Sequence, residues 1–335
     1  MTLKELARLA GVHPSTVARV LNDDPRQRVS EEVRDRIVTL AREYGYQPNH
    51  LARSLRTKRS YVVGTIIPDI ANPFFAILFR GIEDALDDSG YSVIMANTDD
   101  DSAREQRSIA MLRGRQVDGL LLATARRKDP TIEALTVGRF PFVLVNRHTD
   151  PIPANTVVPD DYAGAVAAIE HLIALGHRRI AHIAGSDEMS TGYTRSQGYL
   201  DTLERHRLPT DRELLVRGSF REPGGYNTMR RLLALPQPPT AVFAVNDLAA
   251  LGAMRAIEEA GLQVPHDISI VGFNDLSAAI GTTRLLTTVR LPLHEMGKIA
   301  AGRLLAEITG EVFSPEPIVI PVELVVRQST GPVPA

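Results

Sequence analysis

Residues 3–22 of the 335-residue chain read LKELARLAGVHPSTVARVLN. Thr2 and Glu5 have the spacing of a capping box, and the apolar side chains that follow share one face of a short helix. Glycine readily adopts the left-handed conformation that ends helices, so Gly11 is expected to end this one. Pro14 suits the first turn of a second helix. Two short helices joined by a turn with glycine predict a helix-turn-helix, whose second helix enters the DNA major groove.

A third helix and a positive charge complete this head. Ser30 is placed to cap a helix that runs to Gly45 and closes a small core over the first two. Residues 1–60 hold twelve basic and seven acidic side chains, whereas the whole chain has a net charge of −2. Phosphate contacts dominate the affinity of proteins for nucleic acids, so a basic head on an acidic body predicts that the head alone binds a polyanion.

The body alternates apolar runs with helical stretches, and the pattern starts again after residue 160. The expected strands are 61–68, 91–97, 117–124 and 140–147, then 178–185, 213–219, 240–247, 268–275 and a last one over 322–328; the expected helices are 73–90, 104–116, 162–175, 192–206, 224–234 and 248–260. Continuous rather than alternating apolar strands indicate parallel sheets that are covered on both faces. The fold class expected is therefore an all-α helix-turn-helix head plus an α/β body of two doubly wound lobes.

Polar and aromatic side chains gather where these strands end and helices begin, which is where open α/β sheets bind ligands. They are Asn72, Phe74, Phe75, Asn146, Arg147, Arg195, Phe220, Asn246, Asp247, Asn274 and Asp275. Amides and acids pair with hydroxyl groups, arginine spans two oxygens, and aromatic rings cover the apolar faces of a sugar. Helix capping by the Asn and Asp residues, and core packing by the phenylalanines, remain the alternative reading.

Other kinds of chemistry are poorly supported. The chain has no cysteine, which excludes disulfides and thiolate sites and suits a reducing cytoplasm, and no stretch resembles a signal peptide or a membrane span. Neither a phosphate-binding loop nor a dinucleotide fingerprint is present, so no cofactor is expected. Three histidines close in sequence, His171, His177 and His182, straddle a helix end and a strand, so no metal site is expected, and the acidic run 99–101 reads as solvated surface.

The stretch VHPSTVARVLN at 12–22 resembles the head of the LacI/GalR family of bacterial transcription regulators, whose usual pattern is VSxxTVSRVLN. His13 replaces the usual serine cap, which predicts a weaker helix start, and Ala18 replaces a serine. The resemblance implies base-edge contacts from Pro14, Ser15 and Arg19, phosphate contacts from Thr16, Ser30 and Tyr46, and a further DNA contact from Asn22. It also implies a hinge helix with Asn49, Ala52 and Leu55, in which Leu55 wedges between base pairs in the minor groove.

The body shares the resemblance, through segments such as ANPFF (71–75), PTAVFAVNDLAALGAMRAI (239–257) and VPHDISIVGFND (264–275), which also resemble periplasmic sugar-binding proteins. By that match these junction residues other than Asp247 line an effector cleft. Asn274 stands where aspartate is usual and Leu291 where glutamine is frequent, so the cleft is expected to be less acidic than the usual one. A neutral sugar is the leading effector, with an anionic sugar derivative as the alternative.

The resemblance sets the expected organisation of the chain. The domains expected are a helix-turn-helix domain over 1–47, a hinge over 48–60, an effector-binding and dimerisation domain over 61–330 (N-lobe about 61–160 plus 293–319, C-lobe about 161–290 plus 320–330) and a tail over 331–335. We therefore expect a cytoplasmic homodimeric repressor that binds a pseudo-palindromic operator and has no enzyme activity. A sugar-binding carrier without DNA function is the competing hypothesis, and a sugar-processing enzyme the third.

Overall fold

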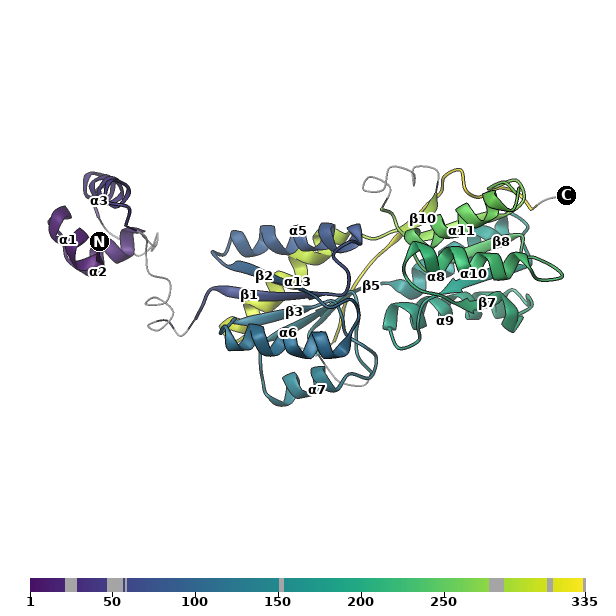
Figure 1. The fold of residues 1–335 in the computed structure, drawn as a ribbon, viewed down its shortest axis with the longest axis horizontal. Helices are drawn as coiled ribbons and strands as arrows, with labels where there is room; N and C mark the ends of the chain where they lie inside the picture. Colours follow the sequence, from purple (N-terminus) through teal and green to yellow (C-terminus); the bar gives the residue numbers. More distant parts are fainter. Residues whose placement is uncertain are drawn as a thin grey trace. The chain divides into compact units, whose positions relative to one another are not determined.

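The computed structural model describes residues 1–21, 29–46, 57, 59–150, 154–276, 286–311 and 316–333. The chain divides into two compact units, Met1–Ser60 and Tyr61–Ala335, each with its own hydrophobic core (Figure 1). The predicted fold class, a helical head and a two-lobed α/β body, is confirmed.

The helices described in the first unit are α1 (Leu3–Ala10), α2 (Pro14–Leu21) and α3 (Glu31–Glu43). The capping box at the start of α1 is confirmed, because the Thr2 hydroxyl accepts from the Glu5 amide at 3.3 Å and the Glu5 carboxylate accepts from the Thr2 amide at 2.8 Å. Gly11 has a φ of 64° and ends α1. The core side chains are Leu6, Ala7 and Ala10 from α1, Val17 and Val20 from α2, and Ile37 and Ala41 from α3.

The helix starts add a detail at His13 and contradict the prediction at Ser30. The His13 Nδ1 accepts a hydrogen bond from the Ser15 amide at 3.2 Å and lies 2.7 Å from the Ser15 hydroxyl, so the imidazole takes the place of the serine cap. An imidazole nitrogen therefore accepts from one of the amides at the start of α2 that have no partner within the helix. Ser30 precedes α3 in an extended conformation, but its side chain makes no capping hydrogen bond.

In the second unit, the N-lobe is built on a six-stranded sheet in the order β11-β5-β4-β3-β1-β2, with every strand pair parallel. Its strands are β1 (Val62–Ile67), β2 (Ser92–Asn97), β3 (Gly119–Leu122), β4 (Phe142–Val145), β5 (Thr156–Pro159) and β11 (Ile318–Ile320). Helices α5 (Pro73–Asp87) and α13 (Leu293–Thr309) cover one face, and α6 (Ser102–Gly114) and α7 (Pro130–Val137) cover the other (Figure 1).

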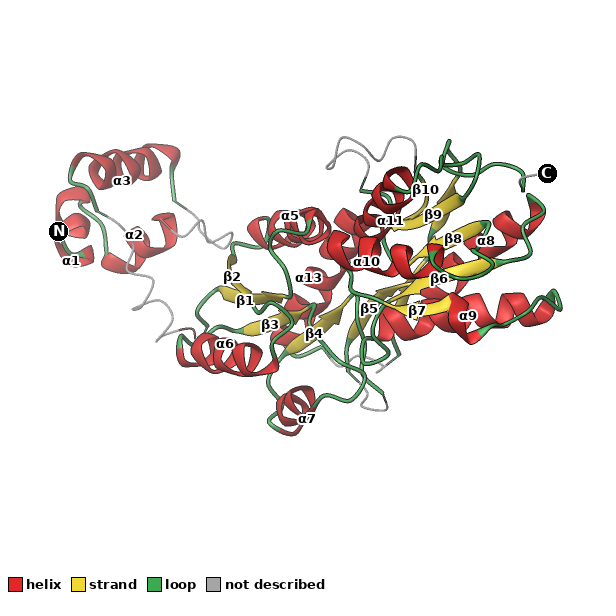
Figure 2. Cartoon of the chain, turned by 45° about the vertical axis from the view of Figure 1, so that its right-hand side comes forward, coloured by secondary structure: helices red, strands yellow, loops and turns green. Residues whose placement is uncertain are grey.

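The C-lobe repeats this plan with the strand order β12-β10-β9-β8-β6-β7 (Figure 2). Its strands are β6 (Ile180–Ala184), β7 (Leu215–Arg217), β8 (Ala241–Ala244), β9 (Ser269–Asn274), β10 (Thr287–Arg290) and β12 (Glu323–Val325), and η1 (Arg212–Leu214) is a short 3₁₀-helix. Helices α8 (Asp161–Ala174) and α9 (Ser190–Arg205) pack on one face, and α10 (Glu222–Leu233) and α11 (Asp247–Glu259) on the other. The edge strand β12 runs antiparallel to β10, unlike the wholly parallel sheet that the sequence predicts.

The chain passes between the two lobes three times. The first crossover is at Asp160, between β5 and α8; the second, at Leu291 and Pro292, joins β10 to α13; the third, at 321–322, joins β11 to β12. The Asp160 amide donates to the Ile320 carbonyl at 2.9 Å, which ties the first crossover to the third. Ile320 therefore belongs to the N-lobe sheet, one residue beyond the expected lobe boundary.

Candidate functional site

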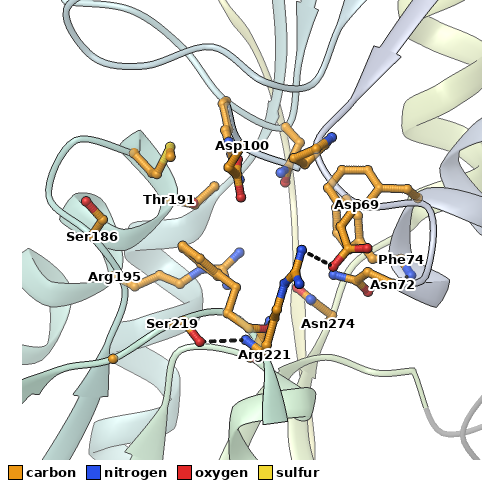
Figure 3. A pocket seen from close by; sticks show the side chains of 18 residues that line it. Asp69, Asn72, Phe74, Asp100, Ser186, Thr191, Arg195, Ser219, Arg221 and Asn274 are labelled. Carbon is orange, nitrogen blue, oxygen red and sulfur yellow. Dashed lines mark hydrogen bonds and ion pairs between the residues drawn. The ribbon is translucent and has the colours of Figure 1, made fainter. Parts of the chain in front are cut away.

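A cavity of about 220 Å³ lies between the lobes, where the carboxyl ends of strands from both sheets meet (Figure 3). Its lining residues are Pro68, Asp69, Asn72, Phe74, Phe75, Asp100, Asn146, Arg147, Ser186, Met189, Thr191, Arg195, Gly218, Ser219, Phe220, Arg221, Asn246 and Asn274. All the strand-end residues that the sequence predicted, except Asp247 and Asp275, lie in this lining. The two repeats of the body therefore bring side chains more than 200 residues apart into one cavity.

On the N-lobe side, α5 and the end of β4 supply the lining. Asn72 caps α5 by accepting from the Phe74 amide at 3.1 Å, so the capping role and the lining position coexist. The Phe74 and Phe75 rings meet edge to face at 4.9 Å, and both are buried. Asn146 has a φ of 69°, and its buried Oδ1 has no hydrogen-bond partner. A left-handed asparagine with an unpaired oxygen is a strained arrangement of a kind that clusters at functional sites.

Arg147 is buried beside Asn146. Its Nη1 donates to Asp100 Oδ1 at 3.0 Å and lies 3.5 Å from the Thr124 carbonyl, while its buried Nε has no hydrogen-bond partner. The guanidinium also lies 5.9 Å from the centre of the Phe220 ring, which comes from the other lobe. The guanidinium of Arg147, a lining residue, therefore has one nitrogen paired with a carboxylate and one buried nitrogen without a partner among the described residues.

On the C-lobe side, α9 supplies Arg195, which is 2% exposed. Its Nε and Nη2 lie 2.8 and 2.7 Å from Asp161 Oδ1, and its Nη1 donates to the Val245 carbonyl at 2.5 Å. The guanidinium stacks on the Phe273 ring at 3.7 Å. Burial raises the pKa of the Asp161 carboxyl, an effect that the adjacent Arg195 guanidinium opposes.

Two further amides complete this wall. Asn246 caps α11 by accepting from the Ala249 amide at 2.9 Å and donates through Nδ2 to the Phe220 carbonyl at 2.8 Å. Asn274 has a φ of 113°, and its buried Oδ1, like that of Asn146, has no hydrogen-bond partner among the described residues. Phe220 reaches the cavity because residue 185 is glycine, since a Cβ there would lie 2.5 Å from the ring.

The charges of the lining are largely neutralised in pairs. Arg147 pairs with Asp100, and Arg195 with Asp161 beneath it. Arg221 of the C-lobe pairs with Asp69 of the N-lobe at 3.0 Å, so this ion pair crosses the cleft (Figure 3). An anionic effector would be favoured by buried arginines without carboxylate partners, but each arginine of the lining has such a partner.

A second contact between the lobes lies in the loop after β3. The Arg127 amide donates to the Glu188 carbonyl at 2.8 Å, and its Nε donates to Asp150 Oδ2 at 2.6 Å. Its guanidinium lies over the Tyr193 ring of α9 at 3.6 Å. The His148 amide, also in the N-lobe, donates to the Ser190 hydroxyl at 3.0 Å. Backbone and side-chain contacts thus join the lobes outside the cavity as well as across it.

Asp275 does not line the cavity, contrary to the sequence-based expectation. Its carboxylate, 5% exposed, pairs with Arg290 at the end of β10 and with Arg327 beyond β12, both at 2.8 Å. Leu291, the position where glutamine was expected, is buried at the second crossover and is also absent from the lining. The side chain of Asp275 therefore joins the end of β9 to the end of β10 and to the segment that follows β12.

Sequence reasoning missed several lining residues, among them Asp69, Asp100, Met189 and Arg221. Asp69 and Arg221 are close in sequence to predicted residues, so reading a few positions further along each junction would have found them. Asp100 belongs to the acidic run that read as solvated surface. Nothing in the sequence pairs it with Arg147, because the two come from different strand ends.

Asp247, at the first position of α11, is buried just behind the cavity. Its two oxygens accept from the Thr288 hydroxyl at 2.5 Å and from the Leu276 amide at 2.7 Å. Burial raises the pKa of this carboxyl to about 7, an effect that these hydrogen bonds partly oppose. Asp247 therefore joins the start of α11 to β10, through Thr288, and to Leu276, which follows β9 two residues after Asn274.

The candidate nucleic-acid interface is the outer face of α2. Val17 and Val20 point into the core of the head, whereas Ser15 and Arg19, four residues apart, share the exposed face. Pro14 and Thr16 are partly exposed, and Ser30 is exposed beside α3. Tyr46 is half-buried, and burial raises the pKa of its hydroxyl. The predicted DNA contacts Asn22, Asn49, Ala52 and Leu55 lie outside the described residues.

Among the described residues, no group of three or more histidine and acidic side chains is arranged to hold a metal ion. Of the histidines considered for metal binding, His177 is instead fully buried, with Nδ1 3.0 Å from the Thr240 hydroxyl and Nε2 3.0 Å from both the Ser269 hydroxyl and the Gly331 carbonyl. Within the described part of the chain, no helix is long and apolar enough to span a membrane.

Comparison with known proteins agrees with this geometry. Residues 2–49 match the family model of bacterial regulatory proteins of the lacI family, and residues 169–330 match that of the periplasmic binding protein-like domain. The chain is 36% identical, over 99% of its length and 97% of the relative, to the transcriptional repressor CytR of Escherichia coli K12. The chain belongs to the LacI family. As a LacI-family member, it is a DNA-binding transcription regulator and not an enzyme, and the hypothesis of a carrier without DNA function is wrong.

Other LacI-family proteins show the same relationship along the whole chain. The ribose operon repressor of Escherichia coli K12 is 36% identical over 92% of this chain and 93% of its own length. The structure of the lac repressor dimer bound to operator and the anti-inducer ONPF has a TM-score of 0.85, at 28% identity and 99% coverage of both chains. The complex of the regulator CelR with cellobiose has a TM-score of 0.75, at 33% identity, covering 98% of this chain and 99% of that one.

Proposed function

We propose that this LacI-family regulator is a repressor whose affinity for operator DNA is set by a neutral, polyhydroxylated molecule of sugar size in the cavity between the lobes. One observation carries the choice of ligand: within the described part of the chain, Asn146 Oδ1 and Asn274 Oδ1 are buried acceptors without partners, and the arginines of the same cavity lining are already paired. A buried acceptor without a donor costs about 1–3 kcal/mol. Ligand hydroxyl groups would donate to both oxygens and remove that cost.

An anionic ligand fits the same cavity less well. The ionised carboxylate or phosphate group of an anionic sugar derivative accepts hydrogen bonds but donates none, so this part of the ligand could not pair with either amide oxygen. It would also have to compete with Asp100 for Arg147, or with Asp161 for Arg195. A neutral polyol needs neither exchange, because it donates to the amides and accepts from the unpaired Nε of Arg147. The neutral effector is therefore the better choice, and the anionic alternative is the one to test against it.

Relatives support a sugar. One LacI-family structure, from Enterococcus faecium, holds bound ribose and is 33% identical to this chain, and CelR is a complex with cellobiose. The Phe74, Phe75 and Phe220 rings would cover the apolar faces of such a ligand. The polar members of the lining, Asn72, Asn146, Arg147, Arg195, Asn246 and Asn274, would pair with its hydroxyl groups.

For the head, we propose that the exposed face of α2 reads base edges in the major groove through Pro14, Ser15 and Arg19, while Thr16, Ser30 and Tyr46 contact phosphates. Asn22 and the segment with Asn49, Ala52 and Leu55 would add contacts toward the operator centre, with Leu55 as the minor-groove wedge. A homodimer would place two heads on a pseudo-palindromic operator in the cytoplasm. Ligand-dependent reorientation of the lobes, through a dimer interface formed by the body, would change the spacing of the heads.

Thermal unfolding of the full chain with D-ribose, cellobiose, D-ribose 5-phosphate and D-glucuronate tests the ligand. A neutral sugar at a hundred times its Kd should stabilise the folded chain by about 2.7 kcal/mol. Asn274→Ala should weaken that stabilisation, whereas Asn227→Ala, on the exposed surface of α10, should leave it unchanged. Stabilisation by the charged sugars but not by the neutral ones would contradict the proposed ligand class. A gel shift with DNA from upstream of the gene, with and without the stabilising sugar, tests the coupling.

A further inference from the structure

Asp161 lies directly behind the cavity but does not line it, because the Arg195 guanidinium stands in between. Both residues are almost fully buried, at 6% and 2% exposure. One carboxylate oxygen, Oδ1, lies within 2.8 Å of two nitrogens on the same edge of the guanidinium. This contact fixes the orientation of the Arg195 guanidinium from the side of Asp161. Asp161 therefore acts on the cavity only through Arg195.

Helix α8, which begins with Asp161, also helps to hold the flat face of the Arg195 guanidinium. Gly164 lies one turn after Asp161 in α8, and a Cβ at that position would lie 2.7 Å from the Phe273 ring. The absence of a side chain lets the ring lie close to α8, and Arg195 stacks on that ring at 3.7 Å. The first turn of α8 therefore supports Arg195 at its edge through a carboxylate and at its face through Phe273. The Val245 carbonyl accepts from Nη1 and completes the support.

Asp161 is also the residue by which the chain enters the C-lobe. It begins α8, immediately after Asp160 at the first crossover, and the Asp160 amide is bonded to the Ile320 carbonyl of the third crossover. A displacement of Arg195 would therefore move the start of α8, and with it two of the three connections between the lobes. No other cavity-lining arginine has its carboxylate partner at a crossover, since Asp100 and Asp69 follow strand ends within the N-lobe.

We propose that Asp161 is a positioning residue that fixes the Arg195 guanidinium at the cavity and couples its position to the angle between the two lobes. The part of this proposal that concerns the ligand rests on the proposed function. The part that concerns the lobe angle does not, because the contacts from Arg195 to the crossovers exist without a ligand. An ion pair this deeply buried is sensitive to the loss of one partner, which leaves the other charge uncompensated.

The lobe angle can be measured directly because the sequence contains no cysteine. Val137→Cys at the end of α7 and Glu258→Cys on α11 place one spin label on each lobe, both at exposed positions. Pulsed electron paramagnetic resonance of the full chain then gives the distribution of distances between the lobes. Asp161→Asn should broaden the distribution or shift its mean, and Asp161→Glu, which keeps the carboxylate, should restore part of the wild-type distribution.

A matched control is Asp211→Asn, which removes a carboxylate from the Arg179 ion pair at the C-lobe surface and should leave the distribution unchanged. A folded Asp161→Asn chain with the wild-type distribution would overturn the proposal. If circular dichroism shows that Asp161→Asn does not fold, the double variant Asp161→Leu with Arg195→Met removes both charges together. That variant should show the altered distribution, and a wild-type distribution would again overturn the proposal.

A second arm measures binding of D-ribose and cellobiose by calorimetry. Asp161→Asn should raise the Kd of whichever sugar binds the wild type by about tenfold or more. This is the effect of misplacing one hydrogen bond to a charged group. Asp161→Glu should recover part of that loss. If neither sugar nor any tested derivative binds the wild type, the proposed function fails, while the distance distributions still decide the role of Asp161.

Discussion

The buried carboxylate of Asp247, next to the cleft, allows a test of how a single buried charge affects the free energy of unfolding. The substitution Asp247→Asn keeps the size of the side chain and removes its charge. One amide oxygen can still accept a hydrogen bond, but the amide nitrogen cannot accept from either the Leu276 amide or the Thr288 hydroxyl. At any pH the variant therefore loses one hydrogen bond, a cost of about 1–3 kcal/mol.

The charge adds an effect that depends on pH. Burial raises the pKa of Asp247 from its ordinary 3.8 to about 7, so the folded chain binds this proton more tightly than the unfolded chain. The stabilisation is fully present below the ordinary pKa and is lost as the pH rises through about 7. Between pH 5 and pH 8, this group alone should lower the free energy of unfolding of the wild type by roughly 3 kcal/mol. Asparagine at 247 contributes no such change.

Urea unfolding of both chains, followed by circular dichroism from pH 5 to pH 8, measures the difference. The free energy of unfolding of the wild type relative to Asp247→Asn should fall with rising pH and level off above about pH 7. Thr288→Val removes a donor that favours the charged carboxylate, so the fall should continue to a higher pH before it levels off. Parallel pH profiles for the wild type and Asp247→Asn would show that the buried carboxylate does not titrate in this range, and would refute the reasoning.

Three further outcomes are expected. Arg19→Ala should cost about 1–3 kcal/mol of discrimination between operator and random DNA in a gel-shift titration, and equal losses on both would exclude base reading. Arg221→Ala breaks the ion pair with Asp69 across the cleft, so stopped-flow measurements should show faster release of the bound sugar; unchanged release would mean that this pair does not restrain the lobes. Gly164→Ala would bring a methyl group against the Phe273 ring and displace it from beneath Arg195, lowering both the melting temperature and sugar affinity, and a variant with wild-type values for both would contradict this.

Much of the architecture could be predicted because its signals are local. Thr2 and Glu5 fixed the start of α1, and continuous apolar runs separated by helical stretches indicated the doubly wound lobes. What failed depended on tertiary context. Helix α13 was not recognised from the sequence, and β12 joins its sheet antiparallel because the chain returns to the C-lobe only at its end. The hydrogen bond from the Ser15 amide to the His13 imidazole could not be predicted either, since no propensity scale describes an imidazole that accepts from the amide two residues on.

The site shows the same division. Strand ends located Asn146 and Asn274, because the carboxyl ends of parallel strands point to one edge of a sheet. The position of a residue at a strand end does not predict the direction in which its side chain points. Asn274 and Asp275 are neighbours with positive φ, and only the first faces the cavity, while the second turns to two arginines from β10 and beyond β12. That choice is made by partners that approach from distant parts of the sequence.

The three crossovers also set an order for folding during synthesis. The N-lobe is translated first, but it cannot be completed until α13 and β11 have left the ribosome, after residue 320. The parallel core of the C-lobe, β6 to β10, is available some thirty residues earlier, by Arg290. Until then α5 lacks the helix that packs beside it, and β5 lacks its edge strand. The usual sequence, in which the first part made is the first part folded, is therefore reversed, and the lobe made second can act as the platform on which the first is finished.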